Sequence, residues 1–167
     1  METFDTIRTR RSIRRFAPTP LPDDAVRRIL EAGRHSGSSM NEQPWTFLAT
    51  RDRATLAALA TVGDHAGHLA GAALGVAIVT PPLDPEGWLM FDVGQAATQM
   101  MLAAWAEGIG SCIASVYRHD DARRILGLPA DRTVDCLLSF GYSAEPPRPP
   151  RAGGRQPFDR VVRWERW

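Results

Sequence analysis

The sequence contains no lysine: its 20 basic residues are all arginine, and 19 acidic residues leave a net charge of +1. A chain this close to neutral has no overall electrostatic attraction to nucleic acid or to a membrane surface. Two cysteines are too few for a disulfide framework, so we expect buried, reduced thiols at Cys112 and Cys136. The longest apolar run, residues 69–79, is too short to cross a bilayer, and no signal peptide is recognisable at the start. We therefore expect a cytoplasmic protein without nucleic-acid or membrane partners.

The composition favours a single domain over residues 1–167. Hydrophobic residues make up 44% of the chain and charged residues 23%, which is typical of globular proteins. A chain of this length buries enough surface to form a real core. No internal repeat is present, and the one biased stretch is the Pro-rich segment 145–151, which we expect to be extended and stiff.

Helical and strand patterns follow one another without a regular βαβ rhythm. We expect helices over residues 4–11, 53–61 and 89–107. Two more helices should begin at an aspartate cap: one runs from Asp23 or Asp24 to Gly33, and the other from Asp120 or Asp121 to residue 126. We expect strands over residues 45–50, 71–80, 111–116 and 133–141. This order favours an α+β fold, with a mixed sheet flanked by helices, over a doubly wound sheet.

The segment after Pro150 has few neighbours in sequence with which to form a core. Residues 151–167 follow the Pro-rich connector and carry apolar side chains from Phe158 to Trp164. We predict that this C-terminal arm docks on a partner chain.

Positive charge is concentrated near the start of the chain, where five arginines lie within residues 8–15. Arg10, Arg11, Ser12 and Arg14 could surround a phosphate, because guanidinium groups bind phosphate oxygens bidentately. The alternatives are a solvated basic stretch or a patch for acidic surfaces and nucleic acid. Near-neutral charge and the lack of a recognised nucleic-acid-binding motif oppose the nucleic-acid alternative.

A polar loop follows at residues 36–45, with the sequence Ser-Gly-Ser-Ser-Met-Asn-Glu-Gln-Pro-Trp. Asn41 and Gln43 each offer a donor and an acceptor, which suits the edge of a flat, hydrogen-bonding ring. Ser38 and Ser39 would add hydroxyl or backbone contacts. The alternative for Asn41 is an Asx-turn in which it bonds its own backbone.

Taken together, the two segments resemble the flavin-dependent nitroreductase family. Its members carry an Arg-Arg/His-Ser-x-Arg/Lys-x-Phe stretch, matched by residues 10–16, and a Pro-Ser-x-x-Asn-x-Gln-Pro-Trp loop, matched by residues 38–45. The usual proline before the serine is Gly37 here. Residues 92–95, 108–112, 125–129, 140–142 and 154–158 also look like the family, so the resemblance spans nearly the whole chain.

The resemblance implies an FMN-binding homodimer with the flavin at the subunit interface. NADH or NADPH would reduce the flavin, and a nitroaromatic, quinone or enone-like small molecule would then take the electrons in a ping-pong mechanism. Flavin N5 would do the chemistry, so no catalytic side chain is implied. The family pattern assigns the phosphate to Arg10, Arg11, Ser12, Arg14 and Arg155, and the ring and ribityl region to Ser38, Ser39, Asn41, Gln43 and the backbone of Ser115 and Val116.

Two histidines, His65 and His68, precede the apolar stretch 71–80, where the family often supplies a polar group to the flavin pyrimidine. His68 is therefore a candidate cofactor contact. The alternatives are a metal pair, for which no third ligand is evident, and simple surface histidines.

The stretch between residues 80 and 91 is brief, so the pocket over the flavin could be open, with Trp88, Met90 and Phe91 as candidate lining residues. An alternative function is flavin binding without turnover, for storage or sensing, since every flavin-holding residue could serve that role equally.

Overall fold

The centre of the molecule is a four-stranded sheet in which every neighbouring pair runs antiparallel. The computed structural model describes residues 2–82, 87–146 and 154–167. The strand order is β1-β2-β4-β3, and the bounds are β1 Thr46–Thr50, β2 Leu74–Thr80, β3 Gly110–Ser115 and β4 Thr133–Gly141. β2 and β4 lie in the middle and are buried along most of their length, which explains their nearly continuous apolar sequences.

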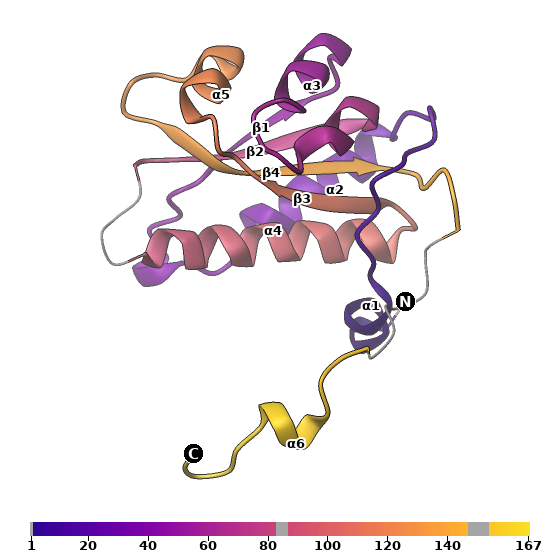
Figure 1. The fold of residues 1–167 in the computed structure, drawn as a ribbon, viewed down its shortest axis with the longest axis vertical. Coiled ribbons are helices and arrows are strands. Elements are labelled where there is room, and N and C mark those ends of the chain that lie inside the picture. The colour runs from indigo at the N-terminus through magenta and orange to yellow at the C-terminus, as the bar shows by residue number, and fades with distance from the viewer. Residues whose placement is uncertain (1, 83–86, 147–153) are drawn as a thin grey trace.

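Helices cover both faces of this sheet (Figure 1). α2 (Asp23–Arg34) and α4 (Trp88–Ala106) pack on one face. α3 (Arg53–Leu59), the short 3₁₀ helix η2 (Ala66–Gly71) and α5 (His119–Leu126) pack on the other. Each face has its own apolar cluster, and the predicted α+β architecture is confirmed. Cys112 and Cys136 are free and buried, also as predicted.

α4 packs closely against α2 and the sheet because its inward side chains are small or flexible. A Cβ atom on Gly33 of α2 would lie 2.1 Å from Cε of Met100 and 3.1 Å from Cζ of Phe47, so a larger residue there would displace the Met100 side chain. Gly108, with a φ of 76°, follows the end of α4 in the left-handed conformation expected there. Among the described residues, no helix is both long enough and apolar enough to span a membrane.

The N-terminal segment lies along the open side of β3. α1 (Thr3–Thr9) is followed by an extended stretch in which Ser12 forms a parallel bridge with Ser111. The amide of Ile13 donates to the Ser111 carbonyl at 2.9 Å. This approach depends on Gly110, because a Cβ there would lie 2.6 Å from Cγ1 of Ile13. Residues 10–16 are thereby fixed against one edge of the sheet.

Several predicted boundaries differ from the structure. The predicted aspartate caps of α2 and α5 are wrong: the cap positions hold Pro22 and Arg118, and the aspartates lie in the first helical turn, where they complement the helix dipole. The strand predicted over 71–80 begins at Leu74, because η2 occupies the residues before it. The loop 36–43 contains a further 3₁₀ turn, η1 (Ser39–Asn41).

The C-terminal arm contains α6 (Phe158–Val161), which lies apart from the sheet and its helices in Figure 1. Phe158, Val161, Trp164 and Trp167 are all exposed. Most of the Pro-rich connector, residues 147–151, lies outside the described residues, so its predicted stiffness stays a prediction. Docking of the arm on a partner chain also stays a prediction.

Candidate functional site

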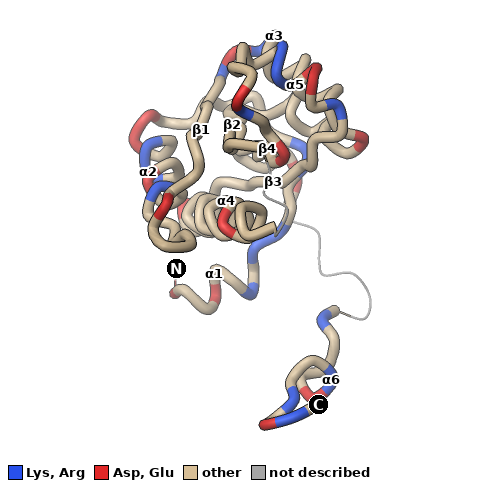
Figure 2. Tube along the Cα trace, turned by 90° about the vertical axis from the view of Figure 1, so that its left-hand side faces the viewer, with Lys and Arg blue, Asp and Glu red and all other residues tan. Residues whose placement is uncertain are grey.

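Two arginines beside β3 have guanidinium groups available to a ligand. Nη1 of Arg10 is buried and has no hydrogen-bond partner within the described residues. Arg14 is exposed, and no hydrogen bond or ion pair joins it to the part of the chain that the structure describes. Ser12 lies between them in the sequence, and its hydroxyl acts to lower the pKa of the Cys112 thiol. In Figure 2 this segment forms a basic stretch leading from α1 toward β3.

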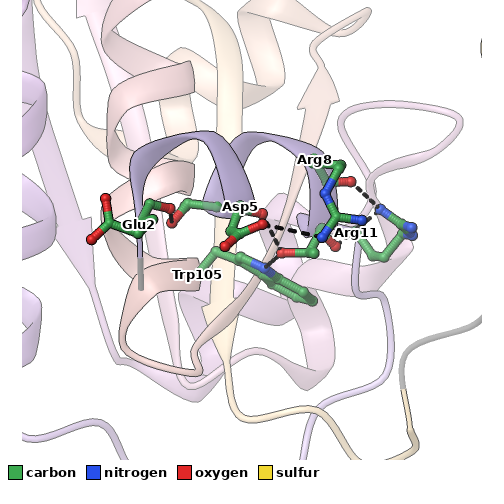
Figure 3. A network of polar contacts seen from close by, with 7 residues as sticks. Glu2, Asp5, Arg8, Arg11 and Trp105 are labelled. Atoms are coloured by element: carbon green, nitrogen blue, oxygen red, sulfur yellow. Dashed lines mark hydrogen bonds and ion pairs between the residues drawn. The ribbon is translucent and has the colours of Figure 1, made fainter.

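Arg11 is oriented differently. Its Nη1 donates to the carbonyls of Arg8, Thr9 and Arg10 at 3.1, 2.9 and 3.0 Å, which closes the C-terminal end of α1 (Figure 3). The same network fastens α1 to α4, since Trp105 Nε1 donates to the Thr9 hydroxyl at 3.0 Å. The predicted phosphate role of Arg11 therefore competes with a structural role seen here.

Behind these arginines lies a buried polar group. His68, from η2, has Nδ1 2.7 Å from Oγ of Ser139, and that hydroxyl donates to the Cys112 carbonyl at 3.3 Å. Burial and, after it, the nearby charge of Arg14 together lower the pKa of His68 to about 4. Burial raises the pKa of the Cys112 thiol despite the opposing charges of Arg14 and Arg10, so the thiol stays protonated.

His65 and His68 lie in unlike environments. His65 is exposed at the start of η2, whereas His68 is buried. The alternative that both are simple surface histidines is therefore wrong for His68. The described residues contain no group of three or more histidine, cysteine, aspartate and glutamate side chains that could hold a metal ion.

The end of β3 presents backbone groups to the open edge of the sheet. The amide of Val116 is already used, because it donates to the Asp135 carbonyl at 3.1 Å. Backbone groups alternate in direction along an antiparallel ladder, so the N–H and C=O groups of Ser115 point away from β4. Gly63 packs directly on this residue, and a Cβ there would lie 2.2 Å from the Ser115 carbonyl oxygen. Ser115 is thus the better placed of the two predicted backbone contacts.

The loop that precedes β1 has an unusual backbone. Met40, Asn41 and Gln43 have φ values of 48°, 59° and 50°, a left-handed conformation that non-glycine residues rarely adopt. Ser38 Oγ accepts from the Gln43 amide at 2.9 Å, and Gln43 Nε2 donates to the Asn41 side-chain oxygen at 3.3 Å. Strained backbone of this kind is concentrated at ligand sites in proteins.

One buried carboxylate ties this loop to α4. Asp92 accepts from the Ser39 amide at 3.1 Å through Oδ2 and from Gln95 Nε2 at 3.3 Å through Oδ1. A groove of about 580 Å³ opens next to this contact, between exposed side chains of the same helix. Its lining is Met90, Phe91, Gly94, Gln95, Thr98 and Gln99. Met90 and Phe91 were predicted to line a pocket, and Trp88, also exposed, forms an edge-to-face contact with Phe91.

Within one chain, the predicted site residues fall into two separate groups. The β3-edge group contains Arg10, Ser12, Arg14, His68 and Ser115, and the loop group contains Ser38, Ser39, Asn41 and Gln43. β1 and β3 are opposite edges of the sheet, about 14 Å apart, with helices on both faces between them. Along α4, the loop contact at Asp92 and the α1 contact at Trp105 are separated by about 20 Å. Arg155 is exposed in the C-terminal arm, which belongs to neither group.

The β3-edge group suits a phosphate-bearing ligand with a planar, hydrogen-bonding ring. The unpartnered guanidinium nitrogen of Arg10, the cation of Arg14 and the Ser12 hydroxyl would hold an anion. The open backbone near Ser115 would serve a ring edge lying further along the strand. The charge and hydrogen-bonding groups present therefore fit a flavin mononucleotide in composition.

Sequence reasoning missed three residues that position the site. Gly63 and Asp92 act through contacts more than 50 residues away in sequence, which no local pattern reveals. Ser139 could have been found, because it is a polar residue inside the apolar strand β4.

Comparison with known proteins gives a consistent result. The profile described as "Nitroreductase family" matches residues 7–67 and 62–142. A protein of Archaeoglobus fulgidus named "Putative NADH dehydrogenase/NAD(P)H nitroreductase" is 31% identical over 99% of this chain and 99% of its own length. A "NADH dehydrogenase" of Thermus thermophilus is 28% identical over 93% of this chain and 92% of its own.

Solved structures share the fold. The structure titled "FMN-dependent Nitroreductase" from Clostridium difficile superposes with a TM-score of 0.87 at 23% identity, covering 98% of this chain and 99% of that one. At this identity the likeness establishes the fold alone.

Proposed function

This chain belongs to the nitroreductase family, and from that premise we propose that it is an FMN-dependent oxidoreductase using NADH or NADPH to reduce a small organic acceptor. Nitroaromatics, quinones and enone-like molecules are the acceptor classes we propose. The two substrates would use the same site in turn, in a ping-pong mechanism. The FMN-dependent nitroreductase of Clostridium difficile shares the fold, and the names of the curated relatives include NAD(P)H as donor.

One observation carries the proposal: among the described residues the buried Nη1 of Arg10 has no partner, and it lies in the same segment as Arg14, which forms no hydrogen bond or ion pair with them. A buried guanidinium nitrogen without a partner is costly, and an anion removes that cost. The flavin phosphate is the anion that we assign to this place, with Ser12 as a third contact.

We propose that the complete site needs two copies of the chain. The β3-edge group and the loop group stand at opposite edges of one sheet, and helices block the space between them. In a homodimer, the loop of one copy can meet the β3 edge of the other. Arg155 and the rest of the C-terminal arm would then reach across the same interface.

Each group has a distinct task in this arrangement. When bound, FMN supplies the hydride-accepting and hydride-donating ring. Arg10, Ser12 and Arg14 hold the phosphate end and the neighbouring negative charge, while the Ser115 backbone orients the ring edge. Asn41 and Gln43 from the second copy contact the ring from the other side, and the groove beside Phe91 admits substrates.

The decisive experiment is a visible absorption spectrum of the FMN-reconstituted, desalted protein, followed anaerobically after adding NADH or NADPH. Retained flavin that bleaches is the expected result. A folded protein that retains no flavin would contradict the proposal.

The second candidate, a flavin-binding protein without turnover, predicts a different trace. The flavin would be retained but would stay oxidised with either nucleotide. The exposed groove along α4 favours the enzyme, because a storage protein gains nothing from an open face beside the cofactor.

A further inference from the structure

The imidazole of His68 is anchored at one end. Nδ1 lies 2.7 Å from Ser139 Oγ on β4, and Ser139 Oγ lies 3.3 Å from the Cys112 carbonyl on β3. If Nδ1–H donates to Ser139 and the hydroxyl donates onward to Cys112, each hydrogen is used once. In that arrangement the ring is neutral and Nε2 carries a lone pair.

The other end of the imidazole has no partner in the part of the chain that the structure describes. Nε2 is buried, the residue as a whole is only 7% exposed, and within the described residues no group bonds to this atom. Buried polar atoms in proteins are almost always paired, so a donor is to be expected at Nε2 when the site is complete.

Arg14 is a charged donor whose charge acts on this ring. Ser12 pairs with Ser111 in parallel, and Arg14 follows Ser12 by two residues in the same segment beside β3. Burial and then the charge of Arg14 lower the pKa of His68, while the Ile113 backbone offsets a part of that shift. Two uncharged groups also act on the ring: the Ser139 hydroxyl from β4, and the Ile113 backbone from β3, which would accept from a protonated imidazole.

We propose that His68 is a positioning residue whose Nε2 accepts a hydrogen bond from the Arg14 guanidinium and so fixes that cation at the anion site. The chain of contacts from β4 through Ser139 and His68 then determines where the exposed, flexible Arg14 side chain presents its charge. This inference rests on the proposed function, because the flavin is the ligand that a fixed Arg14 would serve.

The first test needs no cofactor. Nitrogen-15 NMR of the imidazole is expected to show a neutral His68 protonated on Nδ1, and Arg14→Gln is expected to move the His68 pKa up toward its ordinary value. A ring protonated on Nε2, or a His68 pKa that Arg14→Gln leaves unchanged, would overturn the proposal.

The second test is a double-mutant cycle on FMN affinity, measured by quenching of flavin fluorescence. His68→Asn keeps an N–H near the Nδ1 position, and with it the Ser139 contact, but removes Nε2. We expect it to weaken FMN binding about tenfold in the wild-type background and not at all in Arg14→Gln. His65→Gln is the matched control, because His65 is exposed nearby, and it should leave the affinity unchanged.

The outcomes separate the two proposals. An equal loss from His68→Asn in both backgrounds would show that His68 acts without Arg14, and the positioning role would be wrong. If the wild-type protein binds no FMN, the proposed function fails, and the NMR experiment still decides whether His68 and Arg14 interact. Thermal unfolding of each variant checks that the fold is kept.

Discussion

The two halves of the candidate site are held in place by different physical means. Beside β3, residues 10–16 are fixed by pairing with the strand and by close packing of Ile13 on Gly110. The loop at residues 38–43 is exposed, has three non-glycine residues in the left-handed region and is tied to α4 through Asp92.

Because of this contrast, we expect mutations in the two halves to affect FMN affinity and the free energy of unfolding differently. The β3 edge shares its contacts with the core, so changes beneath it should unfold the protein as well as weaken binding. The loop shares few contacts with the core, so changes there should weaken binding with little effect on the free energy of unfolding. The predictions below test that division, beginning with the largest expected effect.

Arg10→Ala should weaken FMN binding by about 3 kcal/mol, roughly a hundredfold, because it removes a partly buried charged contact to the phosphate. Stability should not fall, since Nη1 of Arg10 has no partner among the described residues. Isothermal titration of FMN measures the loss. Arg15→Ala is the control, because Arg15 is exposed and pairs with Glu145; an equal loss in both variants would mean that only general positive charge matters.

Gly63→Ala should destabilise the fold by about 2 kcal/mol, since the new Cβ would lie 2.2 Å from the Ser115 carbonyl oxygen. Urea denaturation measures this change. Gly67→Ala provides the comparison, because a Cβ at Gly67 has no neighbouring atom within 4 Å. If both variants unfold at the same urea concentration, Gly63 is not needed to position the end of β3.

Acidification should destabilise the β3 edge through His68. The unfolded chain takes up the histidine proton below about pH 6.5, while the folded pKa is lowered to about 4, so stability falls as the pH drops through this window. Between pH 7.5 and 5.5 the loss should be on the order of 1 kcal/mol. Comparing denaturation curves of the wild type and His68→Asn at both pH values isolates the effect. Parallel losses in the two proteins would assign it to other groups.

Asp92→Ala should release the loop and weaken FMN binding by about 1 kcal/mol, or roughly fivefold, because the Ser39 amide loses its acceptor. Faster hydrogen exchange at Ser39 should accompany the loss. Asp52→Ala is the control. It removes a comparable contact, in which the Asp52 carboxylate caps α3 by accepting from the Thr55 amide. It should lower stability and leave FMN affinity unchanged. Slow exchange at Ser39 in Asp92→Ala would show that the loop keeps its shape without this tie.

Much of the fold could be predicted because burial leaves a regular pattern in the sequence. The apolar run of β4 and the small residues of α4 gave both elements to within a residue or two. The helix caps could not be predicted in the same way. An aspartate near a helix start can be a cap or a first-turn residue, and the two positions have similar energies.

Some features of the candidate site could be predicted from the sequence and others could not. Arg10, Ser12 and Asn41 belong to short motifs, and their proposed roles come from the resemblance of those motifs to the family. The separation of the two groups depends on the strand order, and the strand order depends on contacts between distant segments. His68 shows the limit most clearly, since its contact with Ser139 joins residues that are 71 apart in the sequence.

The division of the site has a consequence for mixtures of variants. In the proposed dimer, each of two sites takes its β3 edge from one copy and its loop from the other. Combining an Arg10→Ala copy with an Asn41→Ala copy would therefore create one doubly damaged site and one fully intact site. Two proteins that each fail to retain flavin should then regain one flavin per heterodimer when they are unfolded and refolded together.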